Sequence, residues 1–161
     1  DLQLDRQTIS RDTPVFSVDY GSAYAFAKWK HGKKGRLPTQ AEWIWASSGK
    51  DSWPYPWGTE EKNSRINLGF NAEAKKIKDP TYFHVLPAES ISQDRGPFGH
   101  YDLGGNLSEW VDSPAANQEL GKAAQFLGGN YLDEASVRNF EGLRLAPSEQ
   151  GDPRIGFRTA H

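Results

Sequence analysis

Cysteine and methionine are both absent from this chain of 161 residues. The absence of cysteine excludes disulfide bonds, thiolate metal sites and cysteine nucleophiles. The absence of methionine, even at position 1, indicates a processed chain or a fragment. The length fits one hydrophobic core, so we expect residues 1–161 to form a single domain that is the C-terminal part of a longer protein.

Long apolar runs and a strong excess of one charge are also lacking. No apolar stretch approaches the ~18 residues of a membrane-spanning helix, and no export signal is visible. The formal net charge of −2 gives no indication of nucleic acid or an anionic membrane as a partner. The basic segment 28–36 offers a possible nucleic-acid patch, but a helix C-terminus favours the same residues and no second basic stripe supports the patch.

Aromatic residues, glycine and proline are abundant instead. The chain has 6 Trp, 6 Tyr and 8 Phe, although its mean hydropathy is only −0.76. These numbers predict a core that is rich in aromatic rings. Its 16 Gly and 10 Pro favour many turns and few long regular elements.

Two helices are predicted by their capping signals. Asp19 is a suitable N-cap for the first, whose expected inner face consists of Tyr20, Ala23, Tyr24 and Ala27. Thr39 and Glu42 form a capping box at the start of the second, and Gly49 follows its end. Trp43 lies off the inner stripe expected for this helix, which comprises Ala41, Ile44, Trp45 and Ser48.

Extended segments are expected on both sides of the second helix. Residues 1–16 form an extended lead-in with little periodicity. Strands are expected at 82–86, 126–132 and 155–158, the second with a glycine kink. The last part of the chain contains four arginines, which suggest an anion site. We prefer the alternative in which Arg158 braces the core through backbone carbonyls. The other three arginines would then be exposed: Arg138, Arg144 and Arg154.

The stretch 96–111 is the most unusual part of the sequence. Asp102 and Glu109 flank the pair Gly104-Gly105 at a spacing of seven residues. Glycine lets backbone carbonyls turn inward, and carboxylates on either side of such a turn can close on one cation with oxygen ligands. The alternative is a tight turn whose two acids are solvated.

The stretch 51–58 alternates three aromatic residues with two prolines. One interpretation is a ligand-binding groove with aromatic walls. The preferred interpretation is a stiff loop that fills part of the core with rings. The residues concerned are Trp53, Tyr55 and Trp57.

Several phrases, in this order, resemble the formylglycine-generating, sulfatase-modifying family. The resemblance runs from about residue 14 to residue 159, and it implies an α+β, C-type-lectin-like fold with two helices, small antiparallel sheets and much irregular chain. The phrases are Arg36-Leu37-Pro38-Thr39-Gln40-Ala41-Glu42-Trp43, Tyr55-Pro56-Trp57-Gly58, Gly96 through Trp110, Gly128-Gly129-Asn130-Tyr131 and Ile155-Gly156-Phe157-Arg158.

Two departures from the family pattern bear on function. The family's enzymes oxidise a substrate cysteine with copper held by two cysteines, and Asp133 and Arg138 stand about where those cysteines would be. Carboxylate and guanidinium cannot replace thiolates as copper ligands, so the oxidase activity is not expected. The family's N-terminal strands also lack a counterpart before the first helix.

The resemblance also implies structural calcium. Its main site would use the side chains of Asp102 and Glu109 with the carbonyls of Gly105 and Leu107. A second, less well aligned site would use Asn67, Leu68 and Asp79.

The sequence therefore predicts a non-catalytic binding or regulatory module on a calcium-stabilised scaffold, a pseudoenzyme of bacterial signalling or secretion. The alternatives are an enzyme with other chemistry, supported by acids near Asp133 and Glu134, and a structural piece of a larger assembly. The expected partner is another protein or domain, without nucleic-acid binding or direct membrane insertion, and the preferred compartment is extracytoplasmic (periplasmic). The segments expected to bind contain Trp53, Tyr55, Trp57, Asp133, Glu134 and Arg138.

Overall fold

A computed structural model describes residues 2–4, 7–60, 85–112, 123–133 and 142–161. Within these ranges two α-helices and a short 3-10 helix accompany six short strands. The helices are α1 (Tyr20–His31), η1 (Gly32–Lys34) and α2 (Gln40–Ser48). The strands are β1 (Leu2–Leu4), β2 (Gln7–Ile9), β3 (Ser108–Trp110), β4 (Ala123–Leu127), β5 (Arg144–Pro147) and β6 (Ile155–Phe157).

The central sheet has four strands in the order β5-β4-β3-β6. Strand β4 pairs antiparallel with both neighbours, but β3 runs parallel to β6, with Glu109 opposite Gly156. The α+β fold is confirmed, whereas the expectation of purely antiparallel sheets is wrong for this pair. The parallel register places Arg158, which follows β6, beside the end of β3.

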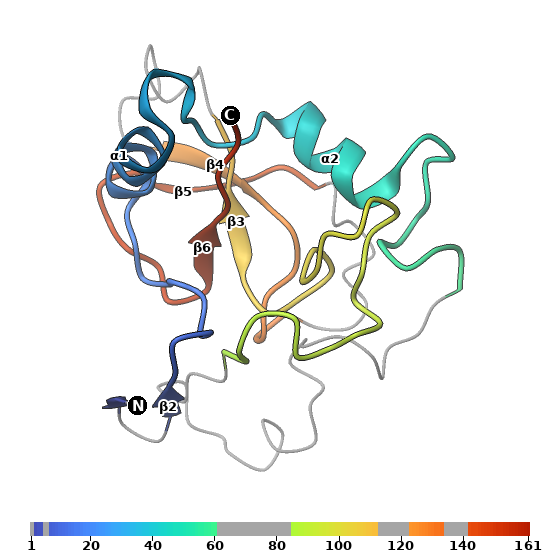
Figure 1. The fold of residues 1–161 in the computed structure, drawn as a ribbon, viewed down its shortest axis with the longest axis horizontal. Coiled ribbons are helices and arrows are strands. Elements are labelled where there is room, and N and C mark those ends of the chain that lie inside the picture. The colour runs from blue at the N-terminus through green and yellow to red at the C-terminus, as the bar shows by residue number, and fades with distance from the viewer. Residues whose placement is uncertain (1, 5–6, 61–84, 113–122, 134–141) are drawn as a thin grey trace.

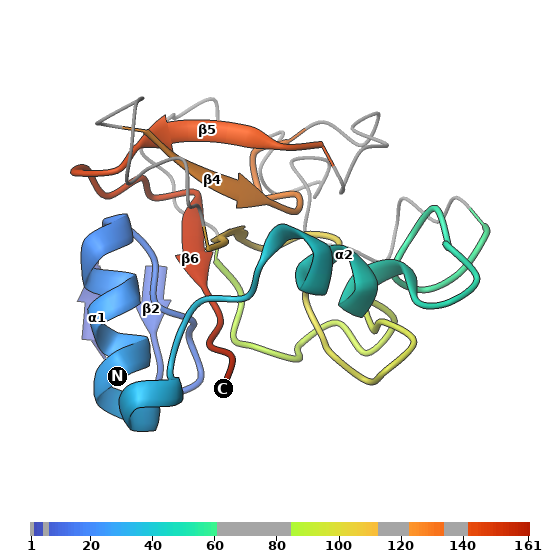
Figure 2. The ribbon, with the colours of Figure 1, turned by 90° about the horizontal axis from the view of Figure 1, so that it is seen from above.

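The two helices lie on different sides of the sheet, and the segment after β6 runs between them (Figures 1 and 2). Arg36 and Ala160 exchange backbone hydrogen bonds there, at 3.0 and 2.8 Å. The cap of α1 is as predicted, because Asp19 Oδ1 accepts from the Ser22 amide at 2.8 Å. The predicted inner face of α1 is confirmed too, with Tyr24 only partly buried.

The inner face of α2 differs from the prediction. Its capping box is confirmed, but Trp43 is the buried ring, 1% exposed, while Trp45 is 54% exposed. The indole N–H of Trp43 donates to the buried carboxylate of Glu109 in β3. The spacing of apolar residues, on which the prediction relied, carries no information about this hydrogen bond. The neighbours of Trp43 in the core are Leu103, Val111 and Leu127.

A second core cluster lies between α1 and the sheet. Trp110 is fully buried there and meets Phe126 edge-on, with ring centroids 5.9 Å apart. Tyr20 of α1 meets the same indole edge-on at 6.1 Å. Three T-shaped rings therefore connect α1 to β3 and β4, as the abundance of aromatic residues predicted.

The strand predictions were only partly right. Strand β6 confirms the last one, and β4 ends at Leu127 because Gly128 has a φ of +83°. Val85 and Leu86 are not in a strand, and 82–84 lie outside the described residues. Strands β1 and β2 pair antiparallel, so strands do precede α1. No helix in the described ranges is long and apolar enough to cross a bilayer.

Candidate functional site

The loop between residues 94 and 109 is built around a buried carboxylate. Asp94 is 1% exposed, and its Oδ1 accepts from the Gly104 amide at 2.9 Å. Its carbonyl accepts from the Asp102 amide at 3.0 Å. Burial raises the pKa of Asp94 to about 7, because the low-dielectric surroundings disfavour the charged form.

Sequence reasoning missed Asp94, since no local signal marks it. The amides that it receives lie about ten residues further along the chain. Gly104 gives an indirect signal, because a Cβ there would lie 2.5 Å from Trp57 Cζ3 and 2.9 Å from Asp94 Oδ1. Glycine is needed at this position for the close approach of two side chains rather than for an unusual φ.

Glu109 is held by two partners from distant parts of the chain. Arg158 Nε donates to Oε2 and Arg158 Nη2 to Oε1, both at 2.5 Å. The indole N–H of Trp43 donates to Oε2 at 2.8 Å. Arg158 also donates to the Tyr101 carbonyl at 3.1 Å. Arg158 therefore braces the core as expected, but its main partner is the carboxylate of Glu109 and only one backbone carbonyl among the described residues, that of Tyr101, accepts from it.

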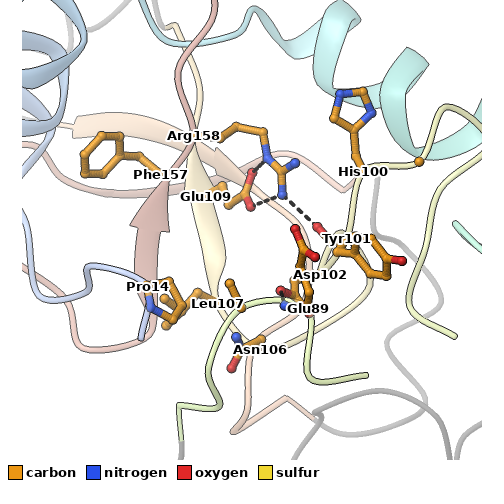
Figure 3. Close-up of a pocket in the computed structure, with 12 residues that line it drawn as sticks. Pro14, Glu89, His100, Tyr101, Asp102, Asn106, Leu107, Glu109, Phe157 and Arg158 are labelled. Atoms are coloured by element: carbon orange, nitrogen blue, oxygen red, sulfur yellow. Dashed lines mark hydrogen bonds and ion pairs between the residues drawn. The ribbon is translucent and has the colours of Figure 1, made fainter. Parts of the chain in front are cut away.

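A cavity of about 360 Å³ opens beside this ion pair (Figure 3). Asp102, Leu107 and Glu109 all line it. Three of the four calcium ligands expected from the resemblance are therefore brought to one cavity. Gly105 is buried beside them but is not on the cavity wall.

Asp102 occupies a strained and partly desolvated position. Its φ is +59°, a left-handed value that non-glycine residues rarely adopt. Its Oδ2 accepts from the Glu89 amide at 2.9 Å. Burial raises its pKa, and the nearby charge of Glu109 raises it further. In the described part of the chain Asp102 forms no salt bridge.

The oxygen donors around this cavity fit a hard cation such as calcium. The carboxylates of Asp102 and Glu109 both turn towards the guanidinium of Arg158 in Figure 3. Both oxygens of Glu109 already accept from Arg158, so Glu109 would have to share them between the guanidinium and the ion. His100 on the same wall has its pKa lowered, first by burial and then by the charge of Arg158. Since no cluster of three acidic or imidazole groups exists in the described ranges, an ion here would need main-chain carbonyls.

The second predicted calcium site cannot be placed. Asn67, Leu68 and Asp79 all lie within 61–84, outside the described residues.

The aromatic residues of 51–58 fill part of the core, as the preferred interpretation predicts, and two of them also line a cavity. Tyr55 and Trp57 stack almost in parallel, with centroids 5.2 Å apart, and pack against the cluster of Trp43. The Trp57 indole N–H donates to the Glu60 carbonyl at 2.9 Å. Trp53 and Trp57 also line a second cavity, of about 740 Å³, together with Arg95.

Asp133 forms a brace and does not reach either cavity. It pairs with Arg144 at 2.9 Å and accepts from the Asn130 amide at 3.1 Å. Arg144 also donates to the Ser108 hydroxyl at 2.7 Å and to the Gly128 carbonyl. Glu134 and Arg138 lie outside the described residues.

The predicted anion site is not formed by the arginines that can be placed. Arg144, Arg154 and Arg158 each hold a different carboxylate of the chain. The prediction that Arg144 is simply exposed is wrong, because its guanidinium bridges β3, the end of β4 and Asp133.

Comparison with known proteins matches residues 3–161 to the sulfatase-modifying factor enzyme 1-like domain. "Inactive C-alpha-formylglycine-generating enzyme 2" of Bos taurus is 34% identical over 155 residues, 91% of this chain and 50% of that protein. "Formylglycine-generating enzyme" of Mycobacterium tuberculosis is 47% identical over 144 residues, 88% of this chain and 43% of that protein. The chain thus spans about half the length of these relatives.

Among solved structures, PvdO from Pseudomonas aeruginosa superposes with a TM-score of 0.73 at 22% identity. The match covers 96% of this chain and 64% of PvdO, and at this identity it shows the fold alone. The family match covers nearly the whole chain. This match and the identity to the curated relatives rest on the sequence, not on the structural superposition. The chain therefore belongs to the sulfatase-modifying factor enzyme 1-like domain family.

Proposed function

We propose that the chain is a non-catalytic binding or regulatory module on a scaffold that calcium stabilises. The observation that carries the first part is the absence of any cysteine from a chain that matches the family over residues 3–161. Copper chemistry of the kind implied by the resemblance needs thiolate ligands. The carboxylate of Asp133 is instead engaged by Arg144, which gives no support to an alternative acid chemistry there.

The existence of a relative named as inactive supports a non-catalytic role. The function then lies on exposed loops that the scaffold holds in position. The proposed partner is another protein or domain, in a bacterial signalling or secretion setting and an extracytoplasmic compartment. These finer points rest on analogy with the family, while the net charge of −2 gives no indication of nucleic acid or an anionic membrane as the partner instead.

The proposed calcium ion would be held by the side chains of Asp102 and Glu109 and the carbonyls of Gly105 and Leu107. Among the described residues no hydrogen bond reaches either of these carbonyls, which leaves them available as ligands. The ion would supply positive charge and tie the loop to β3, with no part in any reaction. A second ion at Asn67, Leu68 and Asp79 remains part of the proposal.

The non-catalytic role is tested by incubating the protein with a cysteine-containing peptide and copper in air. We expect thiol loss no faster than with copper alone, because the chain has no thiolate with which to hold the metal. "Formylglycine-generating enzyme" of Mycobacterium tuberculosis is the positive control. Turnover that requires this chain would overturn the proposal.

A further inference from the structure

An open groove of about 740 Å³ separates the loop 53–57 from the turn 93–99. We call it the aromatic groove and define it by Trp53, Trp57, Gln93, Arg95, Pro97 and Phe98. Phe98 is 53% exposed and stacks on the exposed ring of Trp45, with centroids 5.9 Å apart. The aromatic surface therefore continues beyond the groove onto α2.

The walls of the aromatic groove are fixed before any ligand arrives. Trp57 is held by its stack on Tyr55, by the close approach of Gly104 and by its bond to the Glu60 carbonyl. The opposite wall is a closed turn, in which the Gly96 amide donates to the His100 carbonyl at 2.7 Å. A preformed site loses little conformational entropy on binding.

Arg95 is the one charged side chain on these walls. Its guanidinium lies over the Tyr101 ring, 5.4 Å from the centroid, and against Gly99. In the described part of the chain it has no carboxylate partner. An arginine positioned by a ring and left without an acid is suited to take a carboxylate from a ligand in a bidentate pair.

We propose that the aromatic groove binds a short, extended, proline-containing segment of a partner protein, and that Arg95 pairs with a carboxylate on that segment. The inference rests on the proposed function as a binding module and names the class of partner. Proline-rich segments in the polyproline II conformation have no internal hydrogen bonds and dock in grooves lined by aromatic rings. Their carbonyls point outward and need only a few donors.

The donors in the aromatic groove fit a peptide better than a saccharide. The indole N–H of Trp53 and the amide of Gln93 have no partner among the described residues, so both are available to peptide carbonyls. A saccharide carries a hydroxyl on most of its carbons, and each one that is buried needs its own partner. Three polar side chains are too few for that, whereas they match one carboxylate and two carbonyls.

The test is fluorescence anisotropy with the whole chain in calcium-containing buffer. The probes are labelled peptides of about ten residues in which prolines alternate with glutamates, together with the same peptides carrying glutamine. We expect saturable binding of the glutamate peptides and at least tenfold weaker binding of the glutamine peptides, because a charge-assisted pair is lost. Unlabelled oligogalacturonate, an acidic saccharide, serves as the competing class.

Arg95→Gln should weaken the glutamate peptide at least tenfold and leave the glutamine peptide unchanged. Trp53→Ala should weaken both peptides. The matched controls are Arg11→Gln and Trp29→Ala, an exposed arginine and a 79%-exposed indole outside the groove, and both should bind as the wild type does. Circular dichroism checks that each variant is folded.

Two outcomes overturn the inference. The first is that none of the proline–glutamate peptides binds saturably. The second is that oligogalacturonate binds, that Arg95→Gln abolishes this binding, and that the peptides do not bind. A protein partner that binds wild type and Arg95→Gln equally would leave the proposed function standing and remove only this groove from it. Copper-dependent turnover would instead contradict the proposed non-catalytic function, and the peptide measurement would still decide whether the aromatic groove binds.

Discussion

Trp43 in α2 and Glu109 in β3, 66 positions apart, meet through a buried hydrogen bond of 2.8 Å. Arg158 closes on the same carboxylate from the segment after β6. One side chain therefore joins a helix, a central strand and the C-terminal segment. The candidate calcium loop ends at Glu109. The geometry of the loop therefore depends on this residue both as a brace and as a proposed ligand.

Neutralising Glu109 should be costly. Glu109→Gln keeps the shape but leaves the guanidinium of Arg158 partly buried without its counter-charge, and loss of one partner of a buried ion pair costs about 3–5 kcal/mol. Urea unfolding in the absence of calcium measures the change. The matched control is Asp152→Asn, which breaks a pair whose arginine side chain is 51% exposed and should cost less than about 1 kcal/mol. An equal loss in both variants would contradict the central role of Glu109.

Gly104→Ala should disrupt the contact between the loop and the aromatic segment. The added methyl would lie 2.5 Å from Trp57, and overpacking of this kind costs about 1–3 kcal/mol or more. In a Trp57→Leu background the same change should cost clearly less, because the obstructing ring is gone. Gly21→Ala in the exposed first turn of α1 is the control. Its methyl would lie 3.3 Å from Asp19 Oδ1, a contact that a small shift of an exposed side chain relieves, so its cost should be well below that of Gly104→Ala. Additive losses in the double variant would show that the clash is not the cause.

Asp94 should make the calcium-free protein less stable as the pH rises. Its pKa is about 7 in the folded state and about 4 in an unfolded chain. Between these values the folded state holds a proton that the unfolded state has released. The free energy of unfolding contributed by this group is therefore highest below about pH 4 and falls as the pH rises to about 7, by up to about 4 kcal/mol.

The variant Asp94→Asn isolates this effect. Its amide oxygen can still accept from Gly104, and it cannot titrate. Unfolding of both proteins at acidic and neutral pH should show Asn gaining stability relative to Asp as the pH rises. A difference that stays constant, or that has the opposite sign, would mean that Asp94 is ionised throughout.

How far the sequence predicts this protein depends on the range of the interactions. The caps at Asp19 and Thr39 were predictable because their partners lie three residues away. The burial of Trp43 was not, because its partner Glu109 is 66 positions distant. The pairing of β3 with β6 was also missed, because the two strands lie far apart in the sequence. In addition, strands of three residues carry too little periodicity to be recognised.

The candidate site shows the same division. Asp102 and Glu109 were found because glycines separate two acids within one short loop, and the structure brings both to one cavity. Asp94, Arg95 and Phe98 were not singled out, although they build that loop and the aromatic groove. Their roles depend on Gly104, Tyr101 and Trp45, and no spacing rule connects such pairs.

The most direct test of the calcium-stabilised scaffold is isothermal titration calorimetry of the metal-stripped, folded protein with calcium. We predict saturable binding at or below millimolar calcium, a rise in melting temperature with calcium, and loss of binding at the described loop in Asp102→Asn, with Asp51→Asn, an exposed acid away from the cavity, as the control. Magnesium should bind more weakly, because it demands a stricter octahedral shell. No calcium binding by the folded wild-type protein at millimolar concentration would contradict the account.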